Sequence, residues 1–144
     1  MQVSVRNSLF CRLGEAAIEA RGLTSSAHIE ECDFVGCKHD AVHVCGGCQS
    51  VTMKGCSVVG CATTMDTGWG PALRLEAHNV HMESIFVCEA ICGAEVSGCA
   101  PLQVHASGCN FSKCFLSGLT VSLASGTIEG CTFRYDKTKP TLAQ

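Results

Sequence analysis

Cysteine and histidine are the residues of this chain best suited to bind a metal, and they number thirteen and six in 144 residues. The densest string is HVCGGC, in which His43 precedes the pair Cys45 and Cys48. A zinc site of the ribbon type needs a second such pair at a suitable spacing. Cys88 and Cys92 are separated by three residues. The pattern therefore favours cysteines at a corner beside a Gly-Gly turn, and we expect no metal and no cofactor.

Carboxylate pairs are the second group that could do chemistry, as a general acid and a general base. Such a pair must lie roughly 5 to 9.5 Å apart, on one face of the fold. The sequence has no nucleophile-elbow, P-loop or dinucleotide-binding motif. Whether two carboxylates meet therefore depends on the elements that carry them.

Those elements belong to an internal repeat, seen in AHIEECDFVGC (27–37), VTMKGCSVVGC (51–61) and HASGCNFSKC (105–114). Each copy has an apolar residue, a small residue or cysteine three positions later, and another apolar residue two positions after that. Six copies align: Val5-Ser8-Phe10, Ile29-Cys32-Phe34, Met53-Cys56-Val58, Met82-Ile85-Val87, Ala106-Cys109-Phe111 and Ile128-Cys131-Phe133. Their first members are 24, 24, 29, 24 and 22 residues apart. A nearly fixed period in this range is typical of a solenoid.

Apolar residues inside each repeat alternate with a period of two, which is the spacing of a β-strand. Val51 and Met53 form one such pair, and Leu73 and Leu75 form a second pair later in a repeat. The pattern predicts an all-β, single-stranded parallel β-helix (solenoid) of about six coils of 22–29 residues, the outermost incomplete. We expect this domain over residues 1–133 and a polar C-terminal tail over 134–144.

The repeat resembles the right-handed parallel β-helix of the pectate-lyase-like families and of the β-helical repeats in some F-box proteins. The resemblance covers nearly the whole chain, from Val3 to about Phe133. A left-handed β-helix would show a hexapeptide rhythm, which this sequence lacks. The resemblance implies a fold but no activity, because lyases, hydrolases, adhesins and inert scaffolds share this architecture.

The alignment also stacks cysteines, since equivalent residues of successive coils lie about 4.8 Å apart. Seven cysteines fall in two inward columns, Cys32, Cys56, Cys109 and Cys131 in one and Cys37, Cys61 and Cys114 in the other. Such neighbours point their Cβ atoms the same way, slightly beyond the disulfide range of roughly 3.5 to 4.5 Å. We therefore expect reduced thiols that pack as small hydrophobes, in an intracellular, reducing compartment such as the cytosol or an organelle.

Outward positions form a polar and almost uncharged face. One column of this face contains Ser4, His28, Thr52, His81, His105 and Thr127. His81 and His105 are neighbours in it, but a stable metal site needs three or four ligands. Two interpretations stay open: a solvated sheet, or a docking surface for a protein or a glycan with His81 and His105 as contacts.

Charged outward residues alternate in sign from coil to coil, as they do in cross-strand ion pairs. One such column contains Glu30, Lys54 and Glu83, and another contains Glu19, His43, Arg74 and Glu95. Glu19 and Glu95 are three rungs apart, which is too far for acid and base work on one substrate. We therefore expect no catalytic residue, and a chain that is not an enzyme.

Charge and hydropathy exclude two classes of partner. Ten Lys and Arg against thirteen Asp and Glu give a net charge of −3. Nucleic acid is therefore not expected, because binding to it needs clustered cations. No apolar run reaches the eighteen residues typical of a membrane span.

Two irregular parts of the repeat are the expected contacts with partner proteins. The third period is longer because of the stretch 62–70, ATTMDTGWG, so Trp69, Asp66 and Met65 are partner-binding candidates. The alternative is that Trp69 folds back over the outside of the cylinder. The first coil is the other candidate, with Val3 and Val5, because a terminal coil leaves backbone groups unpaired and its core open.

These features favour a non-catalytic structural or interaction subunit. It would dock onto other protein subunits of a larger assembly through the first coil and the 62–70 loop. One alternative is a carbohydrate-active, pectate-lyase-like enzyme or a fragment of one, with paired carboxylates in a cleft. Another is a glycan-binding module, which would have a groove lined by aromatic residues.

Overall fold

The computed structural model describes residues 2–21, 26–63, 70–98, 102–122 and 124–134. These residues form thirteen strands and no helix, so the fold is all-β as expected. The strands are β1 (Gln2–Arg6), β2 (Leu9–Cys11), β3 (Ile18–Ala20), β4 (Ser26–Glu30), β5 (Asp33–Val35), β6 (Val42–Lys54), β7 (Ser57–Val59), β8 (Pro71–Glu83), β9 (Phe86–Ser97), β10 (Leu102–Ser107), β11 (Asn110–Val121), β12 (Ala124–Glu129) and β13 (Thr132–Arg134).

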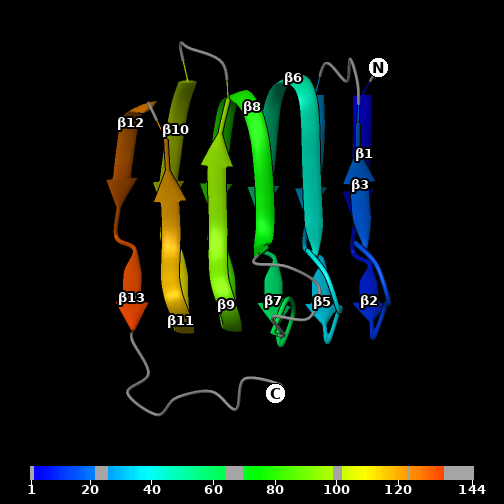
Figure 1. Ribbon diagram of the computed structural model, residues 1–144. Coiled ribbons are helices and arrows are strands. Elements are labelled where there is room, and N and C mark those ends of the chain that lie inside the picture. The colour runs from blue at the N-terminus through cyan, green and yellow to red at the C-terminus, as the bar shows by residue number, and fades with distance from the viewer. Residues whose placement is uncertain (1, 22–25, 64–69, 99–101, 123, 135–144) are drawn as a thin grey trace.

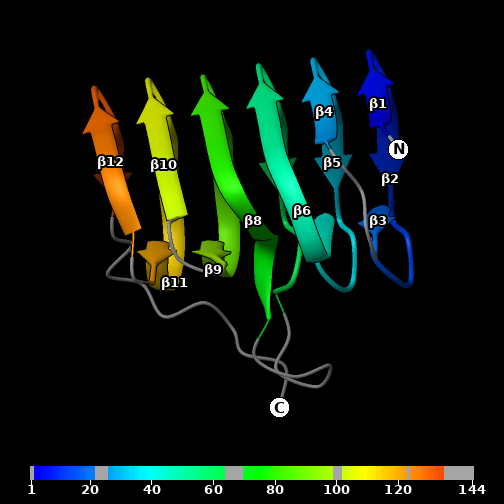
Figure 2. The same cartoon turned by 90° about the horizontal axis from the view of Figure 1, so that it is seen from above.

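All pairings among the described strands are parallel, and they build three faces of a solenoid. The first face contains β1, β4, the end of β6, the end of β8, β10 and β12. The second face contains β2, β5, β7, the starts of β9 and β11, and β13. The third face contains β3, the starts of β6 and β8, and the ends of β9 and β11. Figures 1 and 2 show β1 and β2 at one end of the row of strands, and β12 and β13 at the other.

The register confirms the alignment made from the sequence. The expected inward column on the first face contains Val5, Ile29, Met53, Met82, Ala106 and Ile128. The inward column on the third face contains Ile18, Val42, Leu73, Ala94 and Leu119. The six aligned copies, with the outermost coils incomplete, make a solenoid of about five turns.

Two corners of each turn contain a residue with positive φ. After the first face these residues are Asn7, Glu31, Gly55, Ser84, Gly108 and Gly130, and after the second face they are Arg12, Gly36, Gly60, Glu89 and Lys113. Glycine takes this conformation at no steric cost, whereas other residues are strained by roughly 1 to 2 kcal/mol. The corners therefore stack as regularly as the strands.

The core consists of aliphatic side chains, cysteines and stacked phenylalanines. Phe10 stacks on Phe34 with ring centroids 5.0 Å apart, and Phe111 stacks on Phe133 at 5.3 Å. These stacks form because in-register coils superimpose equivalent side chains. The core opens at the last coil, where Ile128 is 52% and Phe133 is 51% exposed.

Two irregularities interrupt the regular coils, one in the long third repeat and one in the repeat before it. The connection between β7 and β8 has more residues than the one between β5 and β6, as expected for 62–70, and β6 contains a bulge. At the bulge, the five residues from Val44 to Cys48 lie against the three from Leu75 to Ala77. The HVCGGC string is therefore part of a bulged strand where the third face turns into the first.

Candidate functional site

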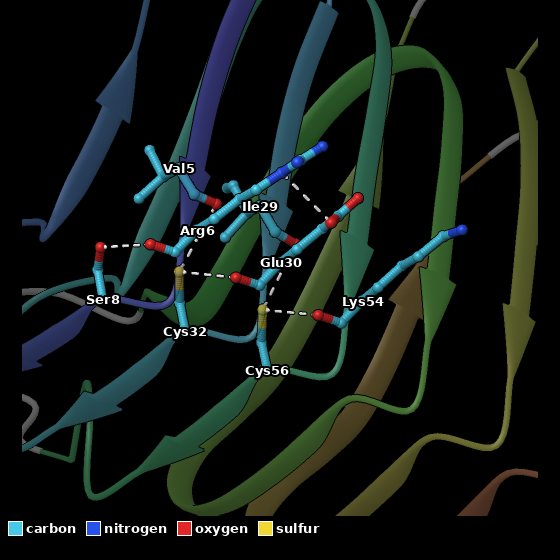
Figure 3. Close-up of polar contacts among 8 residues, drawn as sticks. All are labelled: Val5, Arg6, Ser8, Ile29, Glu30, Cys32, Lys54 and Cys56. Atoms are coloured by element: carbon cyan, nitrogen blue, oxygen red, sulfur yellow. Dashed lines mark hydrogen bonds and ion pairs between the residues drawn. The ribbon is translucent and has the colours of Figure 1, made fainter.

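The first cysteine column supports the corner after the first face. The single hydrogen of the Cys56 thiol has two carbonyl acceptors within reach, Lys54 O at 3.4 Å and Ile29 O of the preceding coil at 3.5 Å; both contacts are drawn in Figure 3. Cys32 makes the same two kinds of contact one coil earlier. In the first coil Ser8 takes this place, and its hydroxyl donates to the carbonyl two residues earlier at 2.9 Å. These thiols therefore act as buried hydrogen-bond donors.

Burial makes the inward thiols poor nucleophiles. It raises the pKa of the Cys56, Cys109 and Cys114 thiols to about 11 and that of Cys61 to about 12, because the thiolate would be desolvated. Thiol reactivity requires the thiolate, so these cysteines are structural. The cysteines within the described residues are all free thiols.

The third face has a charged hollow of about 430 Å³ on its outer side. The ladder of Glu19, His43 and Arg74, from three neighbouring coils, lies along it. Arg21 also lines the hollow and donates through Nε to Glu19 Oε1 at 2.7 Å. The hollow therefore combines carboxylate acceptors with guanidinium donors.

Asp40 lines the same hollow and is only 9% exposed. Burial raises the pKa of its carboxyl group, and the opposing effects of Arg74 and His43 are smaller. Asp40 Oδ2 lies 3.3 Å from Arg74 Nε, but this buried Nε makes no hydrogen bond. The ion pair is thus poorly aligned, and both groups keep unused hydrogen-bonding capacity beside the hollow.

Asp40 also changes the arrangement of carboxylates expected for this face. Asp40 Oδ2 lies 3.9 Å and Glu19 Oε1 lies 3.7 Å from the same atom, His43 Nδ1. The two carboxylates are no farther apart than the sum of these distances, below the roughly 9.5 Å limit for an acid and base pair. Glu19 therefore has a carboxylate nearer to it than Glu95, the one compared with it from the sequence.

Strand alternation does not reveal Asp40, because it lies in the corner two residues before the Val42 rung. The alignment contains a signal all the same. Neighbouring coils have Ala16 and Pro71 at this place, so Asp40 puts a carboxylate among apolar equivalents.

The second face carries an apolar stripe on its outer side. We define the stripe as the column of Cys11, Val35, Val59 and Cys88, with Leu9 and Phe86 beside its two ends and the polar Asp33 and Ser57 between those two. Leu9 is 68%, Val35 is 40% and Phe86 is 37% exposed. Ser112 and Arg134 replace the apolar residues in the last two coils. The stripe therefore lies toward the first coil.

No protein-family model, curated protein or solved structure matches this chain. Function must therefore be inferred from geometry. Within the described residues, no three His, Cys, Asp or Glu side chains are grouped so that they could hold a metal ion. No helix in that part of the chain is long and apolar enough to cross a membrane.

The other partner-binding candidates lie in three places. Val3 and Val5 are half-buried in β1, which pairs with β4 along one edge. Trp69, Asp66 and Met65 lie outside the described residues. His81 and His105 lie in the polar column of the first face.

The histidines of the first face are neighbours, as expected. The His81 and His105 rings have centroids 6.5 Å apart. His105 Nδ1 lies 3.0 Å from Thr127 Oγ1, and His81 Nε2 lies 3.5 Å from Glu83 Oε2. Side chains of this face therefore contact one another from coil to coil. The interpretation of this face as a solvated sheet predicts such contacts.

Proposed function

We propose that the chain is a non-catalytic interaction subunit that docks onto other proteins in a larger intracellular assembly. The apolar stripe is the observation that carries this proposal. A solvated sheet has polar outward side chains, and the first face of this solenoid follows that rule. Contiguous apolar side chains on an outer face are instead typical of protein contacts.

The docking surface comprises the stripe and the first coil. Leu9 and Cys11 belong to both, and Val3 and Val5 lie in the same coil. The 62–70 loop, with Trp69, provides a second contact. We further propose a right-handed β-helix similar to the pectate-lyase-like repeat proteins, without their catalysis, in a reducing compartment that keeps the cysteine columns as thiols.

Single charges placed in the stripe test this proposal. Val35→Lys and Phe86→Lys change exposed residues and should leave the fold intact, as circular dichroism can verify. Thr52→Lys on the outer side of the first face is the matched control. Affinity purification from the native source with mass spectrometry should recover a protein partner with wild type and control, and lose it with both stripe variants. Equal recovery of the partner by all four chains would refute docking through the stripe.

A second candidate function is binding of a sugar in the charged hollow, favoured by the unused polar groups of Asp40 and Arg74. Carboxylates accept hydrogen bonds from hydroxyl groups, and a guanidinium group donates them. NMR titration with neutral oligosaccharides should then shift resonances around the hollow. Asp40→Asn should abolish the shifts. It should also keep the fold, since an uncharged amide of the same size costs less to bury than a carboxylate. Saccharide turnover that Asp40→Asn abolishes would instead indicate an enzyme.

A further inference from the structure

Neighbouring coils are joined by the same two backbone hydrogen bonds at the corner after the first face. In one, the residue with positive φ donates to the following coil; in the other, the first residue of the next strand donates to the preceding coil. At the first junction these bonds are Asn7 N to Glu30 O at 3.1 Å and Asp33 N to Ser8 O at 2.9 Å. At the last junction they are Gly108 N to Glu129 O at 3.0 Å and Thr132 N to Cys109 O at 2.8 Å. The junction geometry is therefore repeated along the solenoid.

The first coil (β1 and β2) and the last coil (β12 and β13) have similar residues on the same rungs. Val5 corresponds to Ile128, and Phe10 corresponds to Phe133. Ile128 and Phe133 are half exposed, as stated above, and Val5 and Phe10 are only partly buried. Each end coil therefore exposes apolar side chains that the equivalent side chains of the other end coil could cover.

Charges on these coils are complementary as well. Arg6 and Glu129 occupy equivalent outward positions in the first and last coils, at opposite ends of one column. From Arg6 through Glu30 and Lys54 to Glu83 this column alternates in sign, and the uncharged Ser107 precedes Glu129. Arg6 Nε lies 3.4 Å from Glu30 Oε2. Arg6 of one chain placed over Glu129 of another would continue that alternation.

We propose that the partner of the first coil is the last coil of a second copy of this chain, stacked head to tail. This inference rests on the proposed function and names the partner. By the junction rule, Gly130 N–H would donate to the Arg6 carbonyl of the next copy, and Leu9 N–H of that copy would donate to the Cys131 carbonyl. Phe10 would stack on Phe133. Because the two surfaces differ, the contact does not close on itself and produces linear oligomers.

Two blocking variants test the geometry. A charged side chain that points inward on an edge strand prevents further pairing. Val5→Lys blocks the first coil, and Ile128→Lys blocks the last coil. Sedimentation velocity of the wild-type chain should give a mass that rises above 15.1 kDa over about a hundredfold range of concentration. Each variant alone should stay at the mass of one chain, and an equimolar mixture should form a dimer and nothing larger.

The outward variant Thr127→Lys, next to the Ile128 rung, is the matched control and should grow like wild type. Arg6→Glu covers the case in which an inward lysine unfolds a coil. It should weaken association several-fold, and adding Glu129→Arg should restore it. A wild-type chain that stays at 15.1 kDa overturns the proposal, and so does a mixture of the two blocked chains that fails to dimerise.

The stripe variant Val35→Lys separates this inference from the proposed function. It should lose other protein partners but still form linear oligomers. If the blocking variants keep associating while Val35→Lys does not, copies meet through the stripe and the head-to-tail contact is refuted. If oligomers form but no stripe-dependent partner exists, the proposed docking function fails and the end contact stands.

Discussion

Cysteine has two uses in this solenoid, as a small core residue and as a weak hydrogen-bond donor at a corner. The columns could be predicted from the sequence, because a fixed period superimposes equivalent residues. The bonds from Cys56 to the carbonyls of Lys54 and Ile29 could not, because they depend on how the corner turns. Asp40 was missed for the same reason, since corner residues do not follow strand alternation.

Stability should fall in alkaline solution because of the buried thiols. The thiol of Cys56 has a pKa near 9.0 when unfolded and about 11 when folded. Above pH 9 unfolding therefore releases a proton, so the contribution is complete below that pH and is lost as pH rises to about 11. Each such thiol should lower the free energy of unfolding by about 1.4 kcal/mol per pH unit in this window. Urea unfolding at pH 8, 9, 10 and 11 measures the slope.

Cys56→Ser is the control for this slope. A serine hydroxyl already fills the equivalent place at Ser8, where it donates to a corner carbonyl. The variant should keep the donor but lose the titration, so its slope between pH 9 and 11 should be smaller by one proton. An unchanged slope would mean that the Cys56 thiol does not titrate in this range.

Strand register is the most predictable element of this fold. Apolar alternation with a repeat near 24 residues places every rung, because a slip of one residue would turn the core side chains outward. The number of strands per coil was less predictable. A repeat has two separate alternating pairs, but β6 and β8 run through a corner as single strands of 13 residues. No glycine or proline interrupts β8 at this corner. In β6 the bulge accommodates the change of direction.

Corner residues with positive φ should control stability in opposite directions. Gly108 has φ 61°, and an added Cβ would meet only Ser84 Oγ at 3.8 Å. Gly108→Ala should therefore cost about 1 kcal/mol through backbone strain alone. Ser84 has φ 54° on the same ladder, and Ser84→Gly should be more stable by about 0.5 to 1 kcal/mol. Thermal unfolding measures both, and changes of the same sign would show that the corner is not strained.

The whole molecule has unlike faces: a polar first face, an apolar stripe on the second and a charged hollow on the third. This difference follows from the outward residues once the register is known. The hollow does not, because it also needs the corner residue Asp40 and the close approach of Gly70. The two ends also differ in charge, which permits directional stacking. Taken together, the stripe and the first coil are the surfaces best suited to a protein partner.

Alkylation of Cys11 is the measurement that tests docking most directly. Cys11 is exposed in the isolated chain and belongs to both the stripe and the first coil. Its labelling rate should be compared in the isolated chain and in the assembly purified from the native source, with Cys45, outside this surface, as the internal control. The account predicts that Cys11 becomes several-fold slower to react in the assembly while Cys45 does not change. Equal labelling of Cys11 in both states would contradict it.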